Sequence, residues 1–304
     1  MENRCQKLVL EADEGITFNF SKGASGEVII RASHNITANV NLPNYANPPI
    51  PPEYQYVCGT WEHGFVIERE SDGSQFVWVP VGALSSTGTL DGEHFSEKFG
   101  RRNYQNDKFS ECQFDEPMTD ELLKQIESVN KYGGFYISRY NISANAKKEP
   151  QSVKGVMPWV NINFDKAKEI AADIERGREV KSHLPYGAEY DSIFEWLIKS
   201  NAKTFKDITS DSTDWGNYSN AKGFSGSGEV LKTGSNDKWC ANNIYDLAGN
   251  VSEWSQEQYR YSYRVNRGGW SNNNENYYSV SSRGYGVTFK SYPFTGFRVA
   301  LYIK

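Results

Sequence analysis

Apolar and polar residues alternate in several short runs along the chain, and this is the pattern of β-strands with one buried face. Two such runs, residues 16–20 and 27–31, are separated by a turn that contains Gly, and residues 35–40 form a third. Further along, residues 64–68 and 75–81 flank an Asp-Gly pair, which predicts a β-hairpin. The pattern therefore predicts a chain rich in short antiparallel strands.

Three other segments have the spacing of amphipathic helices. Residues 119–129 carry acidic residues in the first turn, apolar residues three and four apart, and Gly133 just beyond the end. A second helix is predicted to begin near Asn163 and to stop at Gly177. A third follows the Leu-Pro-Tyr-Gly sequence of residues 184–187, and its apolar stripe is expected in the core.

Segments without periodicity divide the chain. Residues 42–54 contain five prolines and predict a stiff linker. They leave residues 1–41 as a small β-rich segment, which buries little surface on its own and is expected to serve attachment or oligomerisation, and residues 55–304 as the main domain. Within that domain residues 82–117 and 204–236 are polar, and we expect long surface loops there, the second held by contacts other than hydrophobic burial.

Composition excludes several classes of partner and site. The formal net charge is -5 and no Lys/Arg run occurs, so neither nucleic acid nor an anionic membrane surface is an expected partner. No stretch predicts membrane insertion, and we expect no signal peptide. The cysteines, at positions 5, 58, 112 and 240, form no C-x-x-C pair, so they predict free thiols and neither a zinc site nor a redox motif.

Several short motifs then occur in a fixed order. They are Phe-Val-Trp-Val-Pro (76–80), Phe-Tyr-Ile-Ser-Arg-Tyr (135–140), Pro-Trp-Val-Asn-Ile-Asn-Phe-Asp-Lys-Ala (158–167), Leu-Pro-Tyr-Gly-Ala-Glu (184–189), Asn-Ile-Tyr-Asp-Leu-Ala-Gly-Asn-Val-Ser-Glu-Trp (243–254), Arg-Gly-Gly (267–269) and Gly-Phe-Arg-Val (296–299). Together they make residues 55–304 resemble the formylglycine-generating enzyme family. The resemblance implies an irregular, loop-rich α+β domain of the C-type-lectin-like fold.

Enzymes of that family oxidise a substrate cysteine with copper held by two cysteines soon after the Arg-Gly-Gly motif. Alignment on that motif puts those positions at about Asn273 and Tyr278, and residues 241–304 contain no cysteine, so we expect no copper and no oxidase activity. A related branch resembling this domain binds iron through a histidine cluster. The histidines here, His34, His63, His94 and His183, have no ligand spacing, and we expect no iron.

The segment from Tyr259 to Tyr285 has six Tyr, five Ser and five Asn, the composition of antibody-like binding surfaces. It also resembles the variable region of proteins diversified by retroelements, many of them phage receptor-binding proteins. A polar loop with ordinary exposed aromatics is the alternative. The predicted ligand-binding residues are Tyr259, Tyr261, Tyr263, Trp270, Asn272, Asn273, Asn274, Asn276, Tyr277, Tyr278, Arg283 and Tyr285.

The family resemblance also implies a structural calcium ion. Its ligand positions fall on Asp246, Gly249, Val251 and Glu253, whose oxygen atoms suit a hard cation. The alternative, which the residues leave equally open, is that Asp246 and Glu253 accept hydrogen bonds in a turn.

The resulting hypothesis is a non-catalytic ligand-binding protein, a phage or prophage receptor-binding protein, whose partner is a cell-surface protein or glycan. It is expected in the virion as part of a phage tail, or in the cytoplasm before release. The N-terminal segment would join it to a tail or another assembly, or form a homo-oligomer that multiplies weak single-site affinity. The alternatives are a metal-dependent oxidase-like enzyme of the same family and a structural virion component.

Overall fold

The computed structural model describes residues 16–22, 28–34, 48–81, 117, 119–175, 177, 179–219, 221, 228–273 and 279–304. The chain divides into two compact units, Met1–Leu42 and Pro43–Lys304. In the first unit β1 (Ile16–Lys22) pairs antiparallel with β2 (Val28–His34), which confirms the first two predicted strands. The third, residues 35–40, lies outside the described residues.

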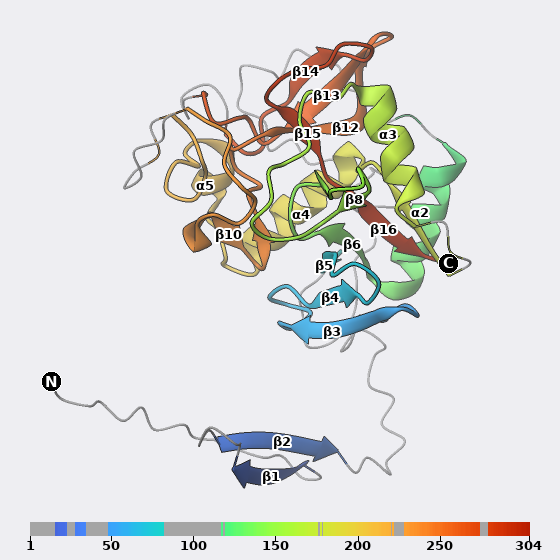
Figure 1. Cartoon of the computed structure of the whole chain (residues 1–304), viewed down its shortest axis with the longest axis vertical. Helices are drawn as coiled ribbons and strands as arrows, with labels where there is room; N and C mark the ends of the chain where they lie inside the picture. The colour runs from blue at the N-terminus through green and yellow to red at the C-terminus, as the bar shows by residue number, and fades with distance from the viewer. Residues whose placement is uncertain are drawn as a thin grey trace, which may run out of the picture. The chain divides into compact units, whose positions relative to one another are not determined.

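The second unit contains a six-stranded antiparallel sheet with the order β3-β4-β5-β6-β16-β9 (Figure 1). The last strand of the chain, β16, lies between β6 and β9, so the C-terminal motif is part of the centre of the fold. The strands are β3 (Tyr54–Cys58), β4 (Val66–Arg69), β5 (Gln75–Pro80), β6 (Gly134–Ser138), β9 (Val180–His183) and β16 (Ala300–Ile303).

Both faces of this sheet are covered. On β5, Val77 belongs to one core cluster, with residues of α4 (Gly187–Lys199), and Phe76 belongs to a second cluster, with residues of α3 (Phe164–Asp173). Successive side chains of a strand point to opposite faces, so an uninterrupted apolar run is what a strand between two layers requires.

The three predicted helices are present, and end signals explain their limits. In α2 (Asp120–Tyr132) the Thr119 hydroxyl accepts the Leu122 N–H at 3.1 Å, and Gly133, at φ 80°, closes the last turn. The Asn163 side chain caps α3 in the same way. That helix ends at Asp173, before the predicted stop at Gly177.

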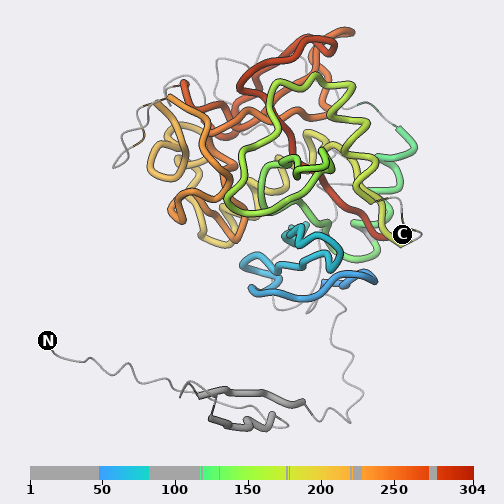
Figure 2. The backbone as a smooth tube through the Cα atoms, viewed as in Figure 1, coloured from blue at the N-terminus to red at the C-terminus, as the bar shows by residue number. Residues whose placement is uncertain are grey.

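The prediction for residues 204–236 was wrong in part. The segment contains α5 (Phe205–Thr209), and Ile208, Trp215 and Tyr218 are buried in the core cluster that α4 joins. Hydrophobic burial therefore does hold this segment, through apolar residues too widely spaced to form a period. Figure 2 shows how much of the path between α4 and the C-terminal strands runs through loops, with short elements η2 (Asp237–Trp239), β10 (Cys240–Ala241) and β11 (Ile244–Tyr245). The other predicted loop, residues 82–117, lies almost entirely outside the described residues.

The second unit begins before residue 55. Pro51 and Tyr54 are buried, and the Tyr136 hydroxyl donates to the Pro49 carbonyl at 3.0 Å, so residues 48–54 of the predicted linker pack on the main domain.

A second sheet, with the order β14-β13-β12-β15, carries the C-terminal motifs. It consists of β12 (Ser252–Arg260), β13 (Tyr263–Arg267), β14 (Gly284–Val287) and β15 (Thr295–Phe297). A separate two-stranded ribbon pairs β7 (Ser143–Ala144) with β8 (Pro150–Gln151). Within the described ranges, no helix has the length and apolar character needed to cross a bilayer.

Candidate ligand-binding surface

The outer end of the second sheet carries three tyrosine rings in mutual contact, which we call the tyrosine cluster. Tyr259 and Tyr285 stack with centroids 4.3 Å apart, and Tyr263 meets the Tyr285 ring edge-on at 5.8 Å. Tyr261, in the turn between β12 and β13, is 97% exposed, and the Arg260 guanidinium lies 4.9 Å from the centroid of the Tyr259 ring. The cluster therefore exposes amphipathic rings beside a cation.

Strand register produces the cluster. Tyr285 of β14 pairs with Val265 of β13, and the three strands β12, β13 and β14 are adjacent. Along β13, alternate residues on one face run from the buried Arg267 through the buried Val265 to the half-buried Tyr263. One face of the sheet thus passes from the interior to the surface within five residues.

The inner end of that face is a buried ion-pair network of Asp191, Glu257, Arg267 and Arg283. Arg283 donates from Nη2 to Asp191 Oδ2 at 2.6 Å and from Nε to Glu257 Oε1 at 2.7 Å. Arg267 donates from Nη2 to Asp191 Oδ1 at 2.6 Å, and its Nη1 lies 3.5 Å from Glu257 Oε2, an ionic contact longer than a hydrogen bond. Two carboxylates thus face two guanidinium groups, with no side chain of the four more than 2% exposed.

Burial decides the direction of the pKa shift for two groups of this network, whereas Asp191 and Glu257 raise the pKa of Arg283 although burial opposes this. Burial raises the pKa of Asp191 despite the adjacent Arg283 and Arg267, and it lowers the pKa of Arg267. The prediction that Arg283 belongs to the ligand-binding surface is corrected here, because its side chain is 2% exposed and engaged on both sides by carboxylates. The network ties α4 to β12, β13 and the start of β14, and so gives the tyrosine cluster a rigid base.

A pocket of about 340 Å³, which we call the aromatic pocket, adjoins the tyrosine cluster. Trp270 and Phe294 stack across it with nearly parallel rings, 13° apart and 6.4 Å between centroids. A Cβ on Gly284 would come within 2.3 Å of the Asn266 side-chain oxygen, so the absence of a side chain at 284 keeps Asn266 in place. The described residues that line the pocket carry no charge; they are Asn266, Trp270, Gly284, Tyr285, Tyr292, Pro293, Phe294 and Thr295.

The asparagines predicted for this surface have different positions. Asn272 is exposed. Asn273 is 7% exposed: its Oδ1 accepts the Trp270 N–H at 3.0 Å and its carbonyl accepts the Ser219 N–H at 3.0 Å, so this side chain fixes a turn. Asn274, Asn276, Tyr277 and Tyr278 lie outside the described residues.

Of the eight described residues that line the aromatic pocket, the sequence predicted only Trp270 and Tyr285 as binding residues. Tyr292, Pro293 and Phe294 come from the loop between β14 and β15, directly before the Gly-Phe-Arg-Val motif. The available signal was a proline between two aromatic residues in an otherwise polar loop.

The positions of the implied calcium site show how each carboxylate is engaged. Glu253 Oε1 accepts from Asn141 Nδ2 and Arg298 Nε, both at 2.6 Å, and Oε2 accepts from the Tyr190 hydroxyl at 2.9 Å. The Arg298 guanidinium therefore already supplies the positive charge beside Glu253, and this carboxylate fits a cation poorly.

Asp246 presents the opposite case. Its Oδ2 accepts the Gly234 N–H at 2.7 Å, while its buried Oδ1 has no hydrogen-bond partner among the residues that the structure describes. Burial raises the pKa of Asp246 to about 6. An unpartnered, buried carboxylate oxygen of this kind could act as a ligand atom. Asp246 is 1% exposed, and Gly249 and Val251 nearby in the chain are buried as well.

Metal ligands and reactive thiols are the other groups that could support catalysis in this fold. Across the described residues, no three His, Cys, Asp or Glu side chains gather in an arrangement that could hold a metal ion. Cys58 and Cys240 are free thiols, and burial raises the pKa of the Cys240 thiol, which makes it a weaker nucleophile at neutral pH. Cys5 and Cys112 lie outside the described residues.

The fold and the C-terminal motifs define an α+β protein of the C-type-lectin-like class. The model of the sulfatase-modifying factor enzyme 1-like domain matches residues 64–303, and the chain belongs to this formylglycine-generating enzyme family.

Similar solved structures share little sequence with this chain. PvdO from Pseudomonas aeruginosa is 14% identical, with 78% of this chain and 97% of that chain covered at a TM-score of 0.45. Treponema denticola variable protein 1 is 13% identical, with coverages of 82% and 99% and a TM-score of 0.41. CarF is 14% identical, with coverages of 56% and 87% and a TM-score of 0.39. No curated protein sequence matches the chain significantly.

Proposed function

We propose that this chain is a non-catalytic ligand-binding protein that uses the tyrosine cluster and the aromatic pocket as one binding surface. The observation that carries the proposal is the position of both features at the outer end of one sheet, where Tyr285 belongs to both. In this reading the protein is a phage or prophage receptor-binding protein, and its ligand is a protein or glycan on a cell surface.

The chemistry of the surface supports binding. Tyrosine and tryptophan offer large contact areas at low cost in conformational entropy, and they dominate the energy of many interfaces. The rings of the tyrosine cluster support one another, and the buried ion-pair network lies under them, so little ordering has to occur when a ligand arrives. The described lining of the aromatic pocket is uncharged and mostly aromatic, which favours a neutral group, such as a sugar ring or an aromatic side chain, in that part of the surface.

The residues at the positions of the family's two copper-binding cysteines support a non-catalytic role. The side chain of Asn273 accepts a turn hydrogen bond, and neither an amide nor the phenol at Tyr278 supplies a thiolate. A protein that oxidises cysteine through this site would need both sulfurs.

Two further elements of the proposal have their own tests. A retroelement that diversifies residues 272–279 predicts a near-identical template repeat and a reverse transcriptase gene beside this gene, and the neighbouring DNA sequence decides it. A calcium ion at Asp246, with carbonyl ligands from Gly249 and Val251, predicts that chelation lowers the melting temperature; an unchanged melting temperature removes it.

The binding function is tested with Tyr261→Ala and Tyr285→Ala in a cell-adhesion assay on candidate host strains, followed by a glycan array. Tyr261 is 97% exposed, so its loss leaves folding unchanged while removing a contact ring. We expect each variant to bind about tenfold or more weakly, the effect of losing one aromatic hot spot. Phe205→Ala, which truncates a 59% exposed ring on α5, is the matched control and should bind normally.

Adhesion that survives both tyrosine substitutions would contradict the proposal. So would conversion of a cysteine-containing peptide to an aldehyde by the purified protein with copper and oxygen, because that result would restore the enzyme interpretation.

A further inference from the structure

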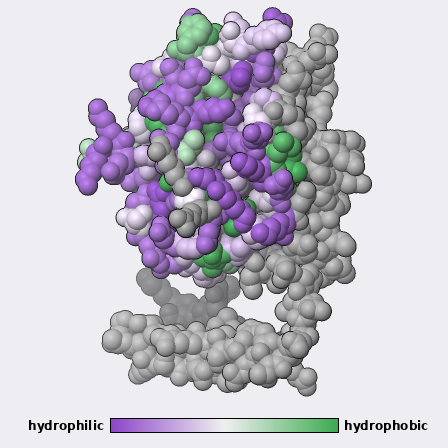
Figure 3. All heavy atoms as spheres, turned by 90° about the vertical axis from the view of Figure 1, so that its right-hand side faces the viewer, coloured by the Kyte–Doolittle hydropathy of each residue, from purple (hydrophilic) through white to green (hydrophobic). Residues whose placement is uncertain are grey.

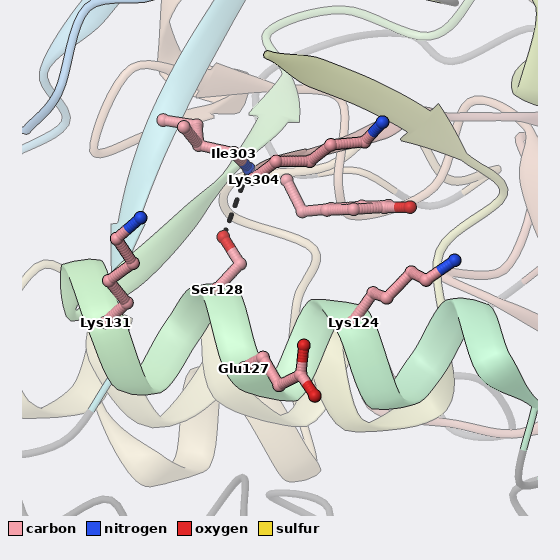
Figure 4. Close-up of a pocket in the computed structure, with 7 residues that line it drawn as sticks. Lys124, Glu127, Ser128, Lys131, Ile303 and Lys304 are labelled. Carbon is pink, nitrogen blue, oxygen red and sulfur yellow. Dashed lines mark hydrogen bonds between the residues drawn. The ribbon is translucent and has the colours of Figure 1, made fainter. Parts of the chain in front are cut away.

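A second pocket, of about 430 Å³, lies between α2 and the end of β16 (Figure 4). We call it the lysine pocket, because three of its lining side chains are Lys124, Lys131 and Lys304, and among the described lining residues Glu127 has the one acidic side chain. In Figure 1 the end of β16 lies well below β13 and β14, so this pocket is separate from the tyrosine cluster.

The lysine charges are available to a ligand. Lys124, Lys131 and Lys304 are all exposed, and within the part of the chain that the structure describes none of them forms an ion pair. Lys124 and Lys131 are seven residues apart on α2, so they share a helix face and their Cα atoms are separated by about 10 Å along the axis. Figure 4 shows their ammonium groups at opposite ends of the pocket, with Lys304 above them.

The floor of the pocket is a built structure. The Ser128 hydroxyl accepts the Ile303 N–H at 3.1 Å, and the Tyr132 hydroxyl donates to the Lys304 carbonyl at 3.0 Å. These two bonds fasten β16 to α2 on either side of Ile303, which is 9% exposed. The lysines therefore surround a fixed, partly apolar floor.

We propose that the lysine pocket docks an acidic segment of a partner protein in an extended conformation. The Cα atoms of Lys124 and Lys131, about 10 Å apart, match about three residues of extended chain, so two acidic residues that far apart can each meet one lysine. An apolar residue between the acidic ones covers the floor. The side of the molecule that carries α2 and the C-terminus faces the viewer in Figure 3, and its described surface is mainly hydrophilic, so charge and not a broad apolar patch selects the partner.

The test uses a labelled peptide, acetyl-Glu-Glu-Phe-Glu-Glu-amide, and fluorescence anisotropy with the full chain. The double variant Lys124→Gln/Lys131→Gln should bind about tenfold more weakly, since each exposed charge contact contributes up to about fivefold. The matched control is Lys147→Gln/Lys148→Gln, which removes two other exposed lysines and has the same net charge. It should bind as the unmodified protein does, and so should Tyr261→Ala.

Binding should weaken as salt is raised from about 0.05 to 0.3 M, since screening acts on exposed charges, and the peptide with Gly in place of Phe should bind less tightly. Three results would overturn the proposal. They are equal weakening by the two double variants, which indicates nonspecific charge attraction; no peptide binding at millimolar concentration; and full displacement of the peptide by an equal concentration of inorganic triphosphate, which indicates a small-anion site.

Discussion

The sharpest stability prediction concerns Arg283, which the buried ion-pair network holds in the interior. The substitution Arg283→Met removes one of two guanidinium groups that face Asp191 and Glu257 at 2.6 and 2.7 Å. The remaining charges are two carboxylates and one guanidinium, all 0% exposed. Removing one partner from a buried charge pair costs about 3–5 kcal/mol because the other charge stays buried without compensation.

The assay is urea unfolding at neutral pH, followed by tryptophan fluorescence. A loss of about 3–5 kcal/mol corresponds to a fall in melting temperature of roughly 6–20 °C for a domain of this size. Arg260→Ala is the control, since Arg260 is exposed at the end of β12 in the same sheet and its loss should change the free energy of unfolding by less than about 0.5 kcal/mol. Asp191→Asn combined with Arg283→Met restores the charge balance and should recover part of the loss.

The reasoning is refuted if Arg283→Met costs less than about 1 kcal/mol, the contribution of an exposed ion pair, and at the same time abolishes ligand binding. That pair of results would place the Arg283 side chain at the surface, as composition alone predicted.

Three further predictions concern single groups. Because burial raises the pKa of Asp246 to about 6, the stability that this group adds is fully present below its ordinary value near 3.8 and is lost as pH rises through 6. Asp246→Asn should therefore stabilise the protein by up to about 3 kcal/mol at pH 7.5 and by less at pH 5, measured by urea unfolding. If the variant is instead less stable than the unmodified protein in the presence of calcium, that result supports a calcium ion bound at Asp246. Gly284→Ala should displace Asn266 and weaken ligand binding, which isothermal titration would measure, while Gly73→Ala, with open space around it, alters stability only through its own positive φ. His183 lies 3.0 Å from Glu189 and its pKa is raised although burial opposes this, so stability should fall as pH rises through that pKa, and His183→Gln should flatten the pH profile of unfolding.

Local signals explain which parts of the fold were predictable. The helix limits followed from Thr119, Asn163 and Gly133, whose capping roles depend only on neighbours in sequence. The C-terminal motifs were enough to identify the fold. The burial of the segment that contains α5 was not predicted, because Trp215 and Tyr218 are isolated apolar residues in the sequence. Their burial depends on partners elsewhere in the chain.

The candidate site was less predictable for the same reason. Composition pointed to the tyrosines, but it could not separate Tyr285, which lies in the cluster, from Arg283 two residues earlier. The partners of Arg283 are 26 and 92 residues away, at Glu257 and Asp191, so its burial follows from tertiary pairing alone. The binding role of residues 274–278 stays a prediction, since these residues lie outside the described part of the chain.

Arg267 and Arg283 hold together the two ends of one segment of the chain. The two arginines flank the segment 268–282 in the sequence, and both form ion pairs with the same carboxylates, Asp191 and Glu257. The two ends of this segment are thus held to each other and to α4 by side chains that lie outside it, while the buried Asn273 and Val280 constrain it from within. Substitutions at the exposed Asn272 should therefore cost less folding stability than substitutions at those two positions.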